Sequence, residues 1–159
     1  MRTTSAKMML SAGAAVLLIV GVAGAAYWIF SPREPLVGVS IGERLVYYVE
    51  LADDPAEQSR GLSGRQSLGE NQGMLFTFPA KGRYGFWMHG MQFALDFIWI
   101  AGDRIVGAQQ NVPVEPGVAT PRIYYPPEDV DLVLEINAGE VARQNITVGE
   151  RIEVFTEEL

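Results

Sequence analysis

Four short motifs between residues 60 and 100 carry the strongest structural signal in this chain: Arg60-Gly-Leu62, Gly73-Met-Leu-Phe-Thr-Phe78, Phe86-Trp-Met88 and Leu95-Asp-Phe-Ile-Trp-Ile100. The last three are rich in aromatic and apolar residues, which is typical of buried β-strands. Asp96 lies inside the longest apolar run. Both faces of its strand are therefore expected to be buried, with the carboxylate in or beside the core.

A carboxylate in the core requires a partner, because an unpaired buried charge is strongly destabilising. Arg60 and Arg65 are the expected partners of Asp96, since a guanidinium can bind a carboxylate through two hydrogen bonds. The favoured interpretation is an internal brace that fixes the loop after the first helix. Two alternatives remain open: a polar ligand held in a cleft by arginine and carboxylate, and acid–base catalysis by Asp96.

The flanking segments complete one β-rich domain. Strands are expected at residues 37–41, 44–51, 73–78, 86–88, 95–100, 105–110, 131–136 and 152–155. Asp54-Pro-Ala-Glu57 has the residues of a helix start, and residues 138–144 predict a second short helix. Five of the nine prolines lie between Val112 and Pro127, which predicts a long loop there. The fold class is therefore α+β: a compact, barrel-like, mostly antiparallel single domain with one or two short helices.

Residues 8–30 form an uncharged run of 23 residues, rich in Ala, Val, Leu, Ile and Gly. A helix of this length, at about 1.5 Å per residue, would span about 35 Å and could cross a hydrocarbon core of about 30 Å. Arg2 and Lys7 precede the run, so the positive-inside rule places residues 1–7 in the cytoplasm. We expect a single-pass transmembrane anchor at 8–30, a linker at 31–36 and an extracytoplasmic domain at 37–159.

The same run also has features of a secretory signal, because Ala23-Gly-Ala25 resembles a cleavage site. An uncleaved anchor is favoured for two reasons. The run is longer than the roughly 7–15 residues of a signal h-region, and it continues into the interfacial aromatic pair Tyr27-Trp28. In both cases the domain is exported, and the inner or cytoplasmic membrane is the expected location.

Composition excludes several kinds of function. The 12 basic residues include Arg2 and Lys7, so ten remain against 19 acidic residues and the exported part carries a net charge of −9. This balance argues against binding to nucleic acid or anionic lipid. The absence of cysteine excludes disulfides and thiol chemistry. With one histidine, His89, a histidine metal site is not expected.

The order and spacing of the motifs resemble domain of unknown function family 192, over roughly Val37 to Phe155. The residues that carry the resemblance are Arg60-Gly-Leu62, Arg65, Leu68, Gly73-Met-Leu-Phe-x-Phe78, Phe86-Trp-Met88, Leu95-Asp-Phe-Ile98, Leu134-Glu135, Gly139 and Gly149. The resemblance implies a small, compact, β-rich domain, often exported or membrane-tethered, with no established activity. The chain departs from the family pattern at Ser63 and at His89-Gly-Met91, which puts recognition of any shared family ligand in doubt.

Five residues are the candidates for ligand binding: Arg60, Arg65, Trp87, His89 and Asp96. The ring of Trp87 could stack on a sugar, although an aromatic residue in a strand is more often part of the core. His89 is more often a partly exposed packing residue than a ligand or base. Glu135 is the strand carboxylate that could act with Asp96 in catalysis; its structural alternative is a second brace or a surface position.

These observations favour a membrane-anchored, extracytoplasmic binding domain for an envelope saccharide or peptide. One alternative is an envelope glycan hydrolase that uses Asp96 and Glu135, which would require the two carboxylates to face each other across a cleft. Another is an interaction module that contacts a second envelope protein through the loop around Tyr124 and Tyr125. Binding is favoured over catalysis, and no cofactor or metal is expected.

Overall fold

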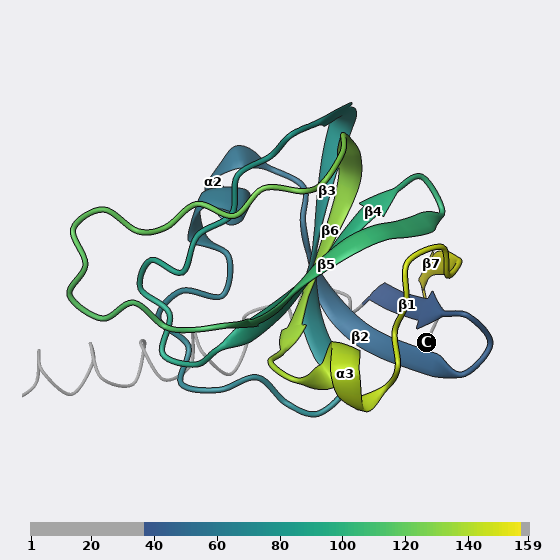
Figure 1. The fold of residues 1–159 in the computed structure, drawn as a ribbon, viewed down its shortest axis with the longest axis horizontal. Helices are drawn as coiled ribbons and strands as arrows, with labels where there is room; N and C mark the ends of the chain where they lie inside the picture. The colour runs from purple at the N-terminus through teal and green to yellow at the C-terminus, as the bar shows by residue number, and fades with distance from the viewer. Residues whose placement is uncertain (1–36, 157–159) are drawn as a thin grey trace, which may run out of the picture. The chain divides into compact units, whose positions relative to one another are not determined.

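Residues 37–156 are described by a computed structural model of the chain, in which seven strands form one sheet (Figure 1). The strands are β1 (Val37–Ile41), β2 (Leu45–Ala52), β3 (Gln72–Gly82), β4 (Leu95–Ala101), β5 (Arg104–Val112), β6 (Val130–Asn137) and β7 (Ile152–Thr156). Two short helices accompany them, α2 (Pro55–Arg60) and α3 (Glu140–Arg143). The strand order is β5-β4-β6-β3-β2-β1-β7, and every neighbouring pair is antiparallel except β2 and β3.

The prediction of a mostly antiparallel domain with one or two short helices is confirmed for the described residues. The sheet is strongly twisted and open, however, and is not closed into a barrel (Figure 1). The edge strands β5 and β7 approach each other at one end through the isolated bridge between Arg104 and Arg151. Alternation of apolar residues shows that a strand is buried, but it does not show whether the two edges of a sheet meet.

The strand predicted at residues 86–88 is reduced to a single bridge. The backbone of Phe86 exchanges hydrogen bonds with that of Tyr124, at 2.9 and 2.8 Å, and the pairing goes no further. Pro126 and Pro127 follow closely after Tyr124 and have no N–H with which to continue a ladder. The long proline-rich loop is thereby attached to the sheet at one point.

Helix α2 begins as its sequence predicts. The carboxylate of Asp54 accepts hydrogen bonds from the backbone N–H groups of Ala56 and Glu57, at 2.7 and 2.8 Å, and Pro55 occupies the first helical position. The helix ends at Gly61, whose φ of 48° lies in the region that favours glycine. Arg60 is consequently the last residue of a short helix that packs near the ends of β2 and β3.

The sheet is buried on both faces, as the sequence of β4 predicts. Leu95, Phe97 and Trp99 belong to one core cluster, which the segments between the strands cover. Ile98 and Ile100 belong to the other, which lies on the side of α3. Since side chains alternate along a strand, this division also decides to which face each carboxylate in β4 and β6 points.

Among the residues that the structure describes, no helix is long and apolar enough to cross a membrane. The predicted cytoplasmic N-terminus (1–7), transmembrane anchor (8–30) and linker (31–36) lie outside the described residues. Their assignment therefore stays a prediction.

Candidate ligand pocket

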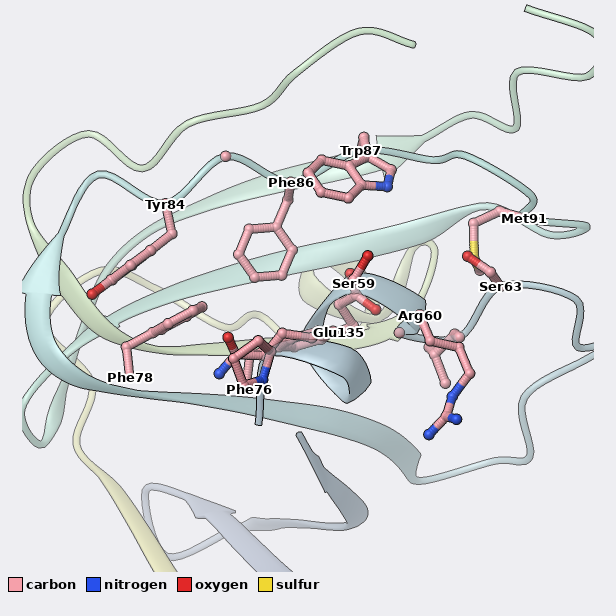
Figure 2. Close-up of a pocket in the computed structure, with 15 residues that line it drawn as sticks. Ser59, Arg60, Ser63, Phe76, Phe78, Tyr84, Phe86, Trp87, Met91 and Glu135 are labelled. Carbon is pink, nitrogen blue, oxygen red and sulfur yellow. The ribbon is translucent and has the colours of Figure 1, made fainter. Parts of the chain in front are cut away.

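A pocket with a volume of about 260 Å³ lies between α2, β3 and the segment that joins β3 to β4 (Figure 2). Five aromatic side chains contribute to its lining: Phe76, Phe78, Tyr84, Phe86 and Trp87. The remaining lining comes mainly from α2 and the turn after it, together with Met91 and Glu135. The pocket is therefore aromatic over much of its surface, with few groups that can carry charge.

Hydrogen bonds hold the two sides of the pocket at a fixed separation. Gln58 in α2 donates from its side-chain amide to the carbonyl of Thr77 in β3, at 2.9 Å. On the other side, the hydroxyl of Ser63 donates to the carbonyl of His89 at 2.7 Å, and the backbone N–H of Gly64 donates to Gly90 at 2.9 Å. These contacts attach the turn after α2 to the segment that carries Trp87.

The aromatic walls are packed against one another. Phe78 and Tyr84 are stacked, with ring centroids 3.6 Å apart and planes 9° from parallel. Phe76 meets Phe86 edge to face at a centroid separation of 4.9 Å. Trp87 is 40% exposed, so its ring is open to a ligand while the rings beneath it are held by packing.

Glu135 provides the carboxylate of the pocket. It lies in β6, opposite Met74 of β3 and Phe97 of β4, and is 5% exposed. Within residues 37–156 its side chain has no hydrogen bond or ion pair, and its oxygen atoms reach the pocket rather than being fully enclosed by protein. Burial raises the pKa of Glu135 from 4.5 to about 8, so the side chain is mostly a neutral carboxylic acid at pH 7.

Three acidic side chains are buried in the described part of the chain, and the other two have partners. Asp96, which is fully buried, accepts hydrogen bonds from the backbone N–H groups of Asn111, at 2.7 Å, and Val141, at 2.9 Å. Glu140 accepts a hydrogen bond from the hydroxyl of Tyr47 at 3.1 Å and pairs with Arg143. Glu135 is thus the exception in a fold that otherwise satisfies its buried carboxylates.

The expected ion pair between Asp96 and an arginine is wrong. Asp96 is buried as predicted, but its two oxygens are satisfied by backbone donors from β5 and α3. Arg65 instead donates to the carboxylate of Glu50 in β2 from both terminal nitrogens of its guanidinium, with one N–O distance of 2.6 Å. The sequence could not indicate this because any residue except proline supplies an N–H group, so the donors leave no signature.

Arg60 lies at the mouth of the pocket, at the end of α2. The pKa of Glu50 is lowered first by its hydrogen bonds to Arg65, and also by the charges of Arg65 and Arg60. No such effect of Arg60 accompanies the raised pKa of Glu135, which burial alone produces. The charge of Arg60 thus contributes to the electrostatics of Glu50.

The structure brings together some of the predicted site residues and separates others. Arg60, Trp87 and Glu135 line the pocket. Arg65 and His89 do not line it, although the backbone carbonyl of His89 supports one wall. Asp96 lies on the other face of the sheet. Phe78, Tyr84 and Met91 were not predicted as site residues, since aromatic and methionine side chains in and beside strands are usually core.

Asp96 and Glu135 do not face each other. In the pairing of β4 with β6, Asp96 lies opposite Ile136 and Phe97 lies opposite Glu135, so the two carboxylates point to opposite faces of the sheet. The arrangement that a two-carboxylate glycoside hydrolase requires is thus not formed by this pair. Among residues 37–156, no three acidic or histidine side chains are placed to hold a metal ion.

The fold and the motifs define a small uncharacterised β-rich domain. The model of the DUF192 family, described as "Uncharacterized ACR", matches residues 38–154. The chain belongs to this family.

Two solved structures are similar to the chain. One, from Sinorhizobium meliloti, is described as a candidate transcription regulator; it is 29% identical, with a TM-score of 0.69, and the match covers 77% of this chain and 96% of the other. The second is a protein of unknown function from Novosphingobium aromaticivorans, which is 33% identical, with a TM-score of 0.65 and coverage of 74% and 84%. No curated protein matches the chain.

Proposed function

We propose that this protein is a membrane-anchored, extracytoplasmic binding domain that holds a saccharide or peptide fragment of the cell envelope in the aromatic pocket. The observation that carries the proposal is the pocket itself, in which five aromatic side chains and one buried carboxyl group surround a volume of about 260 Å³. Binding sites for small molecules commonly combine apolar walls with a few polar groups that orient the ligand.

The polar groups of the pocket suit such a ligand. The side chains of Gln58, Ser59 and Ser63 lie among the lining residues. The hydroxyl of Ser59 can donate or accept a hydrogen bond, whereas Gln58 and Ser63, which donate within the protein, keep an oxygen that can accept one from a ligand. The partly exposed ring of Trp87 offers a flat surface for stacking against a sugar or a peptide plane. The location at the membrane rests on the uncharged run at residues 8–30 and the positive charges before it.

The test uses the full chain in detergent and soluble peptidoglycan fragments released by a muramidase as the probe. A ligand at about 100 times its Kd stabilises a folded protein by about 2.7 kcal/mol, which raises the Tm by several degrees. We expect the fragments to raise the Tm of the wild-type protein and to have little effect on Trp87→Ala. Phe155→Ala is the matched control, because Phe155 is an aromatic residue of β7 that is 36% exposed and lies outside the pocket lining.

A Tm that does not change in the wild-type protein at any accessible concentration of fragments would contradict the proposal. An equal increase in Trp87→Ala would place binding elsewhere on the molecule.

A second candidate function, contact with another envelope protein, is supported by the proline-rich loop. This loop exposes Val118, Ile123 and Tyr125, by 44%, 39% and 60%. A photo-crosslinker at Tyr125 would trap a neighbouring protein in intact cells if the loop is an interface. If a crosslinker that is shown to be reactive traps no specific protein from this position, the loop is not an interface and the pocket is the functional site.

A further inference from the structure

Glu135 requires an explanation that the fold alone does not supply. A carboxyl group in a residue that is only 5% exposed, with no side-chain hydrogen bond within residues 37–156, destabilises the folded protein once it ionises. The same fold satisfies Asp96 with two backbone donors and Glu140 with Tyr47 and Arg143. A ligand that brings its own positive charge into the pocket would give Glu135 a partner that residues 37–156 do not supply.

The charged and titratable groups that face Glu135 are few. From α2 comes Arg60, whose charge acts on Glu50. From the segment after β3 comes Tyr84, whose hydroxyl donates to the carbonyl of Ala80 at 2.6 Å. The neighbours of Glu135 across the two adjacent strands, Met74 and Phe97, carry no charge. Within residues 37–156, Glu135 is therefore the one acidic residue that lines the pocket. Glu50, which lies on the same face of the sheet beyond Met74, is already paired with Arg65.

The aromatic walls favour the same kind of ligand. A cation is attracted to the face of an aromatic ring, most strongly to tryptophan, because the ring face carries partial negative charge. In Figure 2, Glu135 lies among the labelled side chains, with the rings of Phe78 and Phe86 on one side of it and Met91 and Arg60 on the other. The net charge of −9 on residues 31–159 also raises the local concentration of cations.

We propose that the pocket recognises an organic ammonium group, which it holds between the aromatic walls and the carboxylate of Glu135. This inference rests on the proposed function and specifies its ligand: an envelope saccharide or peptide fragment that carries a free amino group. The aromatic rings supply attraction without a permanent charge, and Glu135 supplies the opposite charge at the bottom of the site.

The proposal includes a defined dependence on pH. Below pH 8, Glu135 is protonated in the free protein, so binding of a cation has to release this proton. The affinity for a permanent cation should rise by up to about tenfold per pH unit between pH 6 and 8 and then level off. A neutral ligand that accepts a hydrogen bond from the protonated carboxyl group would show the opposite trend.

The experiment compares choline, a permanent cation, with its neutral isostere 3,3-dimethylbutan-1-ol, by calorimetric titration of the full chain in detergent. We expect choline to bind at least tenfold more tightly than the isostere at pH 8, with an affinity that falls towards pH 6. In Glu135→Gln this preference should fall to the few-fold level that the aromatic rings alone provide, and it should no longer depend on pH. Glu153→Gln is the matched control, because Glu153 is exposed in β7, lies outside the pocket lining and changes the net charge by the same amount.

A second arm separates this inference from the proposed function. Treatment of the peptidoglycan fragments with acetic anhydride neutralises their free amino groups and leaves their sugars and peptide bonds in place. We expect the acetylated fragments to lose their effect on the Tm.

If acetylated and untreated fragments stabilise the wild-type protein equally, the ammonium proposal is wrong although the fragments still bind. It is also wrong if Glu135→Gln keeps the full preference of the wild type for choline. If neither fragments nor choline nor the isostere bind, both proposals fail.

Discussion

Glu135 and Asp96 lie in neighbouring strands, yet they have opposite surroundings. Asp96 receives two backbone hydrogen bonds, at 2.7 and 2.9 Å, on the face of the sheet that carries α3. Glu135 points to the other face, into an aromatic pocket, and burial raises its pKa to about 8. In the pairing of β4 with β6, Asp96 lies opposite Ile136, one position away from Glu135. Because side chains alternate between the two faces, this register places the two carboxyl groups in different surroundings.

The raised pKa of Glu135 predicts a loss of stability as the pH rises. The unfolded chain releases this proton near pH 4.5, whereas the folded protein keeps it up to about pH 8. Between these values unfolding releases a proton, so increasing pH favours the unfolded state by up to roughly 1.4 kcal/mol per pH unit.

Glu135→Gln removes this titration. The free energy of unfolding of the variant, relative to that of the wild type, should therefore increase from pH 5 to pH 8. Urea denaturation at several pH values measures the difference between the two proteins. A difference that does not change with pH would show that Glu135 is solvated or paired in the native protein.

At the scale of elements, Asp96 connects three of them. It belongs to β4, and its donors belong to β5, at Asn111, and to the start of α3, at Val141. Asn111 has a positive φ of 51°, which directs its N–H towards the carboxylate in a part of the β4–β5 pairing where the register shifts. A single side chain thereby fixes a strand irregularity and a helix end.

Asp96→Asn should therefore destabilise the domain, because the amide replaces one acceptor with an N–H donor that faces a backbone donor. The expected loss is roughly 2–4 kcal/mol in the free energy of unfolding. Asp131→Asn is the control: Asp131 also accepts a backbone hydrogen bond, from Gly102 at 2.7 Å, but it is only partly buried, so about 1 kcal/mol or less is expected. Equal losses in both variants would contradict the role assigned to burial at Asp96.

At the scale of the whole molecule, the sequence predicts an anchor that lies outside the described residues. The 23-residue uncharged run at residues 8–30 should keep the protein in the membrane fraction after carbonate extraction. If the domain is exported, protease added outside the cytoplasmic membrane should digest residues 37–159. A cytoplasmic protein that stays undigested in the same sample is the control that the membrane is intact. Release by carbonate, or protection from protease before lysis, would contradict the predicted topology.

Much of the fold was predictable from local signals. Alternating and continuous apolar segments located β2, β3, β4, β5, β6 and β7, and Asp54 with Pro55 located the start of α2. The burial of Asp96 was also predictable, because apolar residues occupy both sides of its strand. Each of these inferences depends on residues that are neighbours in the chain, where the periodicity of strand and helix applies directly.

The partners of the buried groups were not predictable in this way. The donors to Asp96 are backbone N–H groups 15 and 45 positions away, Arg65 binds Glu50 rather than Asp96, and the sheet stays open although its strands resemble those of a barrel. The pocket brings together α2, β3, β6 and the segment before β4, which no local pattern relates.

The chain's order of residues therefore determined its strands, its helix starts and the membership of its core, because these depend on the alternation of polar and apolar side chains. Only the tertiary structure decided that Asp96 is satisfied by backbone donors and that Glu135 lies in an aromatic pocket with no side-chain partner among residues 37–156. The physical reason is that register and long-range packing, rather than residue type, determine which groups come within hydrogen-bonding distance.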